Sequence, residues 1–157
     1  MTIKQFEYKP LAHFSYAILS DNKIALVDPE RDPAQYYAFA EKHNAQIVAV
    51  FETHPHADFI SSHLQIHKET GATIYASKLL GADYAHEHFD DGDLVEMGKI
   101  QFKAVNTPGH SPDSITIAAS NENKTALFTG DTLFIGDVGR PDLREKAGKM
   151  KAKRVDL

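Results

Sequence analysis

Short apolar runs separated by turn-forming residues recur along the chain and predict a sheet-rich fold. Tyr16–Leu19 and Ile24–Val27 flank Asp21-Asn22, which predicts a β-hairpin over residues 14–28. The continuous apolar run Ile47–Phe51, with its two valines, is typical of a strand buried on both faces. Further strands are predicted at 73–76, 93–96, 100–106, 114–119 and 125–128, the last two forming a hairpin around Asn121-Glu122-Asn123.

Helical spacing of apolar residues appears between these strands. Asp32-Pro33 has the form of a helix start, and the helical pattern that follows ends near Asn44. A second helix is predicted over 60–70, before Gly71, and a third begins within 144–154. Because strands and helices alternate and no segment repeats, we interpret residues 1–157 as one α/β domain.

Composition narrows the class of protein. With 42% hydrophobic and 25% charged residues and a net charge of −5, the chain is ordinary for a globular domain and favours neither nucleic acid nor an anionic membrane as a partner. No apolar run reaches the roughly 18–20 residues that cross a bilayer. The N-terminus lacks the apolar core of a signal peptide. We therefore expect a cytoplasmic protein.

The chain has nine histidines and no cysteine. Disulfides, thiolate metal sites and a cysteine nucleophile are thereby excluded. Any metal must be held by imidazole and carboxylate groups, which suits zinc, iron or manganese.

Three of the predicted strands are followed by a potential metal ligand, namely His54, His110 or Asp131. Loops beyond the carboxyl ends of strands form the ligand sites of α/β proteins, so we expect these three side chains to converge. Glycine precedes two of them, at positions 109 and 130, and we interpret both glycines as permitting a sharp turn.

The segment Thr53-His54-Pro55-His56-Ala57-Asp58-Phe59 places two imidazoles and a carboxylate within five residues. His-x-His-x-Asp, followed by Thr-Pro-Gly-His and Phe-Thr-Gly-Asp, resembles the motif series of the metallo-β-lactamase superfamily. The stretches THPHADF, TPGHSPDS and FTGDTLFIGDVGRPDL are most similar to persulfide dioxygenases, notably the bacterial type followed by rhodanese domains. The resemblance extends from about residue 3 to residue 152.

This resemblance implies an αββα sandwich, of which the chain holds the N-terminal half to two-thirds. Domains of the superfamily usually run to roughly 200–250 residues, so we expect a domain incomplete at its C-terminus and without a rhodanese module. A lone half would expose an apolar face, and we expect it to self-associate as a homo-oligomer.

Two departures from the superfamily pattern predict a single metal ion. Phe59 stands where the dinuclear hydrolases have a metal-binding histidine, and no histidine follows His110. His54, His110 and Asp131 remain, a two-histidine, one-carboxylate set that is diagnostic of non-haem Fe(II) oxygenases. The resemblance implies that these three residues hold one Fe(II), for which zinc could substitute.

The resemblance also implies the reaction, in which O2 oxidises the terminal sulfur of a small thiol's persulfide to sulfite. In the persulfide dioxygenases, His56 and Asp58 correspond to groups that orient ligands or substrate. Arg140 matches a basic position near the site, where it either contacts the substrate or forms a structural ion pair with a carboxylate that holds the loop after Asp131.

Two other functions stay open. One is zinc-dependent thioester hydrolysis of the glyoxalase II kind, and the other is a metal-binding fragment that turns nothing over. The remaining histidines are assigned no chemistry: His63 and His67 are expected on a partly exposed helix face, and His86 and His88 in a surface loop.

Overall fold

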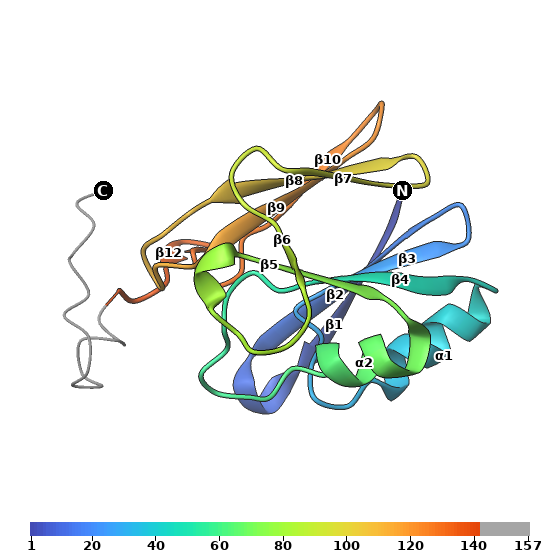
Figure 1. Cartoon of the computed structure of the whole chain (residues 1–157), viewed down its shortest axis with the longest axis horizontal. Helices are drawn as coiled ribbons and strands as arrows, with labels where there is room; N and C mark the ends of the chain where they lie inside the picture. The colour runs from blue at the N-terminus through green and yellow to red at the C-terminus, as the bar shows by residue number, and fades with distance from the viewer. Residues whose placement is uncertain (142–157) are drawn as a thin grey trace.

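The computed structural model describes residues 1–141, in which two β-sheets pack face to face (Figure 1). The first sheet begins with the antiparallel strands β1, β2 and β3 and continues with β4, β5 and β6, which run parallel to β3. These six strands are β1 (Thr2–Tyr8), β2 (His13–Ser20), β3 (Lys23–Val27), β4 (Gln46–Phe51), β5 (Thr73–Ala76) and β6 (Glu87–His88).

The second sheet is antiparallel throughout, in the order β10-β9-β8-β7. It consists of β7 (Leu94–Met97), β8 (Ile100–Asn106), β9 (Ile115–Ser120) and β10 (Thr125–Phe128). A small hairpin of β11 (Leu133–Phe134) and β12 (Asp137–Val138) follows. Short 3-10 turns occur at η1 (Lys9–Leu11) and η2 (Lys78–Leu80).

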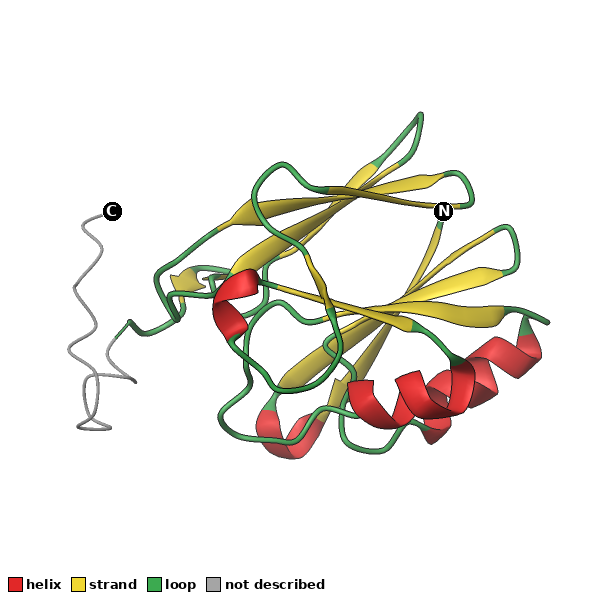
Figure 2. Ribbon diagram, in the orientation of Figure 1, coloured by secondary structure: helices red, strands yellow, loops and turns green. Residues whose placement is uncertain are grey.

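The helices α1 (Ala34–Lys42) and α2 (His63–Thr70) cover the outer face of the first sheet (Figure 2). The helix starts differ slightly from the prediction. Asp32 accepts a hydrogen bond from the Ala34 N–H at 3.0 Å, but the helix begins one residue after Pro33. Residues 60–62 stay outside α2, which ends as predicted at the left-handed Gly71.

Side chains on the two faces of the first sheet enter different cores. Phe51 points between the sheets and stacks on Phe102 with ring centroids 4.8 Å apart. Val50 points the opposite way and is buried with Tyr36 of α1 and Ile66 of α2. The predicted strand at 47–51 is therefore buried on both faces, and the predicted α/β sandwich is confirmed.

Every strand predicted from the sequence is present within one residue of its expected bounds, except that β2 begins three residues before the apolar run Tyr16–Leu19. The two turn residues Asp21 and Asn22 both have positive φ, as the predicted hairpin turn requires. β1 is an additional strand that the pattern did not indicate, because this edge strand is exposed except for Phe6. The predicted helix within 144–154 lies outside the described residues.

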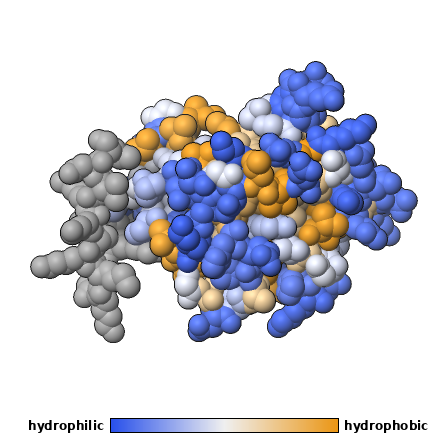
Figure 3. Space-filling view, turned by 45° about the horizontal axis from the view of Figure 1, so that its top comes forward, coloured by the Kyte–Doolittle hydropathy of each residue, from blue (hydrophilic) through white to orange (hydrophobic). Residues whose placement is uncertain are grey.

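The outer face of the second sheet carries no helix from residues 1–141 (Figure 1). In Figure 3 the molecule is turned so that the side with this sheet comes forward, and its surface shows hydrophobic patches between polar ones. Leu127 of β10 is 62% exposed, and the β11–β12 hairpin adds four exposed apolar side chains: Leu133, Phe134, Ile135 and Val138. Exposed apolar side chains are thus present, but β7 and β8 also expose the polar residues Glu96, Gln101 and Lys103, so the expected apolar face and self-association stay predictions. Within the described part of the chain, no helix is long and apolar enough to span a bilayer.

Candidate metal centre

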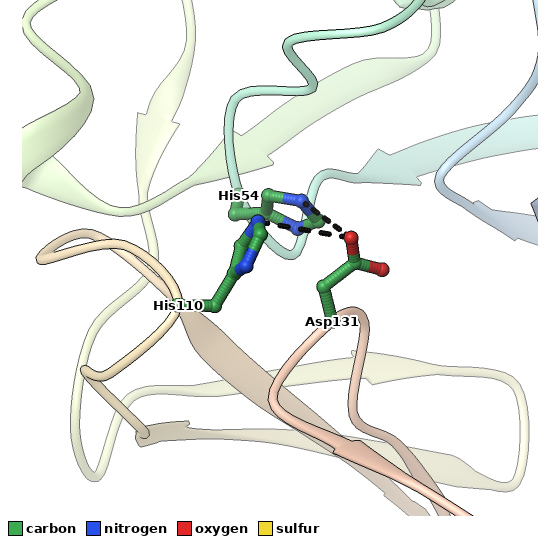
Figure 4. A group of neighbouring side chains, drawn as sticks. All are labelled: His54, His110 and Asp131. Carbon is green, nitrogen blue, oxygen red and sulfur yellow. Dashed lines mark ion pairs between the residues drawn. The ribbon is translucent and has the colours of Figure 1, made fainter. Parts of the chain in front are cut away.

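The structure brings His54, His110 and Asp131 together from three separate loops (Figure 4). These loops follow β4, β8 and β10, so the strand ends converge as the sequence predicts. Asp131 Oδ2 lies 3.8 Å from His54 Nε2 and 3.7 Å from His110 Nε2. One atom from each side chain lies within 4.8 Å of the others, which is a spacing that one shared metal ion could bridge. Their binding of metal stays a prediction.

The hydrogen bonds behind His54 fix the tautomer of its ring. The single hydroxyl proton of Thr53 is donated to Asp28 Oδ2 at 2.7 Å. Thr53 Oγ1 must therefore accept from His54 Nδ1–H, 3.0 Å away. Burial lowers the pKa of His54, and the positive charge of His56 lowers it further. The ring is neutral, and its Nε2 lone pair faces Asp131.

His110 is oriented in the same way by a backbone oxygen. Its Nδ1 lies 3.1 Å from the carbonyl oxygen of Arg140, which can only accept. Nδ1 therefore donates, and Nε2 is the ring nitrogen that faces Asp131. Arg140 is thus tied to the site through its backbone. Gly139 lies so close to Asp131 that an added Cβ would meet the Asp131 carbonyl oxygen at 1.6 Å.

Of the two glycines that precede predicted metal ligands, only Gly130 lies at a position whose backbone conformation requires glycine. Gly130 has φ +50°, and an added Cβ would meet Thr53 Oγ1 at 2.3 Å. Gly109 has no positive φ, and an added Cβ would meet nothing within 4 Å. The interpretation of Gly109 as a necessary turn glycine is therefore wrong, because its conformation is open to any residue.

His56 does not join the group of His54, His110 and Asp131. It belongs to a second buried group, with Asp28 and Glu52. Its Nε2 lies 3.3 Å from Asp28 Oδ1 and 3.4 Å from Glu52 Oε2. Burial opposes a charge on His56, but the two carboxylates outweigh it and raise its pKa to about 10. The pKa of Asp28 is lowered in turn, because the imidazolium of His56, 3.3 Å away, overcomes the effect of burial. At neutral pH the group is two carboxylates around one imidazolium.

The other two residues of the His-x-His-x-Asp segment lie apart from the three converging side chains. Asp58 is exposed and lines a different pocket together with Tyr8 and Arg31. Phe59 packs its ring against His56, with centroids 4.4 Å apart, and against His13 at 4.3 Å. The position of a second-metal histidine in the hydrolases is therefore filled here by an aromatic packing residue.

Sequence reasoning missed Asp28, Glu52 and Thr53 as parts of the site. All three lie at carboxyl ends of neighbouring parallel strands, because Val27 of β3 pairs with Phe51 of β4. Asp28 also accepts a hydrogen bond from the Thr53 N–H at 2.7 Å. The sequence feature that could have identified Asp28 is its position as a polar residue directly after the apolar run 24–27.

A family comparison agrees with this geometry. The profile of the metallo-β-lactamase superfamily matches residues 8–155, and the chain belongs to this superfamily. Among curated proteins, a probable hydroxyacylglutathione hydrolase of Schizosaccharomyces pombe is 32% identical over 135 residues, covering 82% of this chain and 52% of the relative. The mitochondrial persulfide dioxygenase ETHE1 of Homo sapiens is 32% identical over 141 residues, covering 87% and 54%.

Among solved structures, ETHE1 from Myxococcus xanthus superposes with a TM-score of 0.81 at 29% identity, covering 90% of this chain and 62% of that one. The chain thus spans about half the length of the curated relatives it matches. Proteins named persulfide dioxygenase and proteins named hydroxyacylglutathione hydrolase are about equally similar to this chain in sequence, so the residues of the site must distinguish between the two.

Proposed function

We propose that the chain is the metal-binding part of an Fe(II)-dependent persulfide dioxygenase. The observation that carries the proposal is the donor set, in which two imidazoles and one carboxylate meet within 4.8 Å. A two-histidine, one-carboxylate set leaves positions open on an octahedral ion and is typical of non-haem Fe(II) oxygenases. The human relative's name supports the same class.

The residues present fit one bound ion. Both His54 and His110 have Nε2 free because their Nδ1 atoms donate elsewhere. Asp131 is 47% exposed, so the metal would be open to small molecules from solvent. Iron would supply the redox capacity to bind and reduce O2, which zinc lacks. The reaction proposed is RSSH + O2 + H2O → RSH + SO3²⁻ + 2H⁺, in which the terminal sulfur loses four electrons to O2.

His56 would contribute a fixed positive charge beside the metal. Its ring centroid lies 4.4 Å from that of His54, and Asp28 and Glu52 keep it protonated near neutral pH. His56 and Asp58 remain our candidates for orienting the substrate, and Arg140 for holding the loop after Asp131.

Zinc-dependent thioester hydrolysis is the second candidate, supported by the hydroxyacylglutathione hydrolase relatives. It would use a water molecule activated by the metal. The aromatic packing of Phe59 weighs against the second metal ion of such enzymes. A third candidate is a fragment that binds metal without turnover, since residues of the relatives' other half are outside this chain.

Two assays separate these candidates. The iron-loaded protein is mixed with glutathione persulfide in an oxygen electrode, and the zinc-loaded protein with S-lactoylglutathione. We expect oxygen uptake that yields sulfite, lost in Asp131→Ala, and no thioester cleavage. Thioester cleavage without oxygen uptake would support the hydrolase, and neither activity would support the inactive fragment.

A further inference from the structure

A small cavity lies beside the candidate metal centre, between the loop after β4 and the loop after η2. Its volume is about 260 Å³. Its walls are mainly apolar and are formed by Pro55, Phe59, Ile60, Leu80 and Ala82. His54 and His56 also line it, so a molecule held there would lie next to the metal. His63 lines this cavity as well, and we refer to the cavity as the His63 pocket.

His63 is a partly buried histidine whose two ring nitrogens are buried and have unused hydrogen-bonding capacity. Its side chain is 14% exposed, and neither ring nitrogen has a hydrogen-bond partner among residues 1–141. The nearest charged atom is Glu52 Oε1, 3.4 Å from Nδ1, and this contact is not a hydrogen bond. Buried polar groups without partners are rare and point to a bound molecule.

Two charged groups line the pocket, Glu52 and the imidazolium of His56, and together with Asp28 they form a buried group whose net charge is negative. Burial lowers the pKa of His63, so its ring offers one N–H donor and one nitrogen lone pair. The ring of Tyr84 packs on it with centroids 4.9 Å apart. Burial, together with the charge of Glu52, raises the pKa of Tyr84 to about 12. Its hydroxyl therefore keeps its proton and can both donate and accept.

These groups select for a particular kind of ligand. A carboxylate entering the pocket would lose its hydration beside a buried group in which the carboxylates of Asp28 and Glu52 outnumber the one imidazolium of His56, which is unfavourable. A neutral donor and acceptor side by side match an amide, which offers one N–H and one C=O. At about 260 Å³, the pocket lies just below the roughly 300–1,000 Å³ of whole-ligand sites. It therefore suits one arm of a molecule.

We propose that the His63 pocket binds an uncharged, amide-bearing arm of the thiol whose persulfide is oxidised at the metal. This inference rests on the proposed function. It predicts that a thiol joined to a simple amide is preferred to one whose nearby groups are carboxylates. His63 and Tyr84 are the residues that hold the amide, and Glu52 is the residue that disfavours acids.

Binding can be tested without iron or oxygen chemistry. The probes are S-methyl-N-acetylcysteamine, which carries one amide, and S-methylglutathione, which carries carboxylates as well as amides. Their methylated sulfur cannot bind a metal as thiolate. Each is titrated into histidine-labelled protein, and the imidazole resonances are followed by NMR. We expect saturable shifts of the His63 signals with the amide probe and at least tenfold weaker binding of S-methylglutathione.

Variants locate the binding site. His63→Phe should weaken the amide probe at least tenfold, and Tyr84→Phe should weaken it in the same direction if His63→Phe does not fold. His88→Phe is the matched control, because His88 is an exposed histidine outside the pocket, and it should bind as the wild type does.

Three results would overturn the inference: no saturable binding of the amide probe, equal affinity for the two probes, or unchanged affinity in both pocket variants. Because no turnover is measured, these results are independent of the oxygen-uptake assay. Oxygen uptake with no amide binding would refute the pocket alone, and amide binding with no oxygen uptake would refute the dioxygenase alone.

Discussion

Replacing Thr53 with valine tests whether the hydrogen bonds behind His54 prepare it for metal binding. Valine preserves the shape of threonine but removes the hydroxyl that links Asp28 Oδ2 to His54 Nδ1. Asp28 then loses one of its buried donors, while the Thr53 N–H remains. His54 Nδ1–H loses its acceptor, so the ring is free to rotate or to change tautomer.

The size of the effect follows from the type of bond. A buried hydrogen bond to a charged group contributes about 1.5–3 kcal/mol. Groups that orient a metal-ligating histidine typically change metal affinity by about 10–100-fold. We therefore expect Thr53→Val to bind Zn²⁺ about 10–100-fold more weakly than the wild type. Unfolding of the metal-free variant in urea should show a loss of about 1.5–3 kcal/mol.

Competition with a chromogenic chelator measures the zinc affinity, and circular dichroism checks that the variant is folded. Thr53→Ser is the control, because serine keeps the hydroxyl and should bind zinc within a few-fold of the wild type. A folded Thr53→Val protein with wild-type zinc affinity would refute the reasoning, since the link from Asp28 to His54 would then have no influence on the metal.

Further predictions concern the backbone, pH and assembly. Gly130→Ala should weaken metal binding and lower the free energy of unfolding by more than the roughly 1–2 kcal/mol of left-handed backbone strain. Gly136 has φ +82° and open space around it, so Gly136→Ala should lose only the strain energy. Urea unfolding of the two variants measures both losses. His63 has a lowered pKa in the folded state, so acidification below the unfolded value of 6.5 protonates the unfolded chain preferentially. The metal-free wild type should therefore lose stability more steeply than His63→Phe between about pH 7.5 and 5, and parallel slopes would contradict this. In sedimentation, the wild type should have a mass above that of the 17.4 kDa monomer. The double variant Leu127→Lys, Ile135→Lys should have the monomer mass. A monodisperse wild-type monomer would refute self-association.

The positions of the candidate ligands could be predicted from the sequence because each follows a strand with a strong apolar pattern. His54, His110 and Asp131 are placed by strand ends, and strand ends depend on local sequence. The roles of Asp28 and Glu52 could not be predicted, because they depend on which strands are neighbours. Only the parallel pairing of Val27 with Phe51 brings the residues after them together.

Side-chain direction was the other feature that the sequence could not provide. His54 and His56 are two residues apart, yet Nε2 of His54 faces Asp131 while Nε2 of His56 faces two carboxylates. The loop leaves the strand here, so strand alternation no longer sets direction. The same limit applies to His63, whose burial comes from the loop after η2 that packs over α2.

The most direct test of the metal centre is the metal content of protein expressed and purified without oxygen, measured by elemental analysis for the wild type and His110→Ala. We predict close to one iron per wild-type chain and its loss in His110→Ala. Two zinc ions per chain, or iron that stays bound in His110→Ala, would contradict the assignment of a single iron ion to His54, His110 and Asp131.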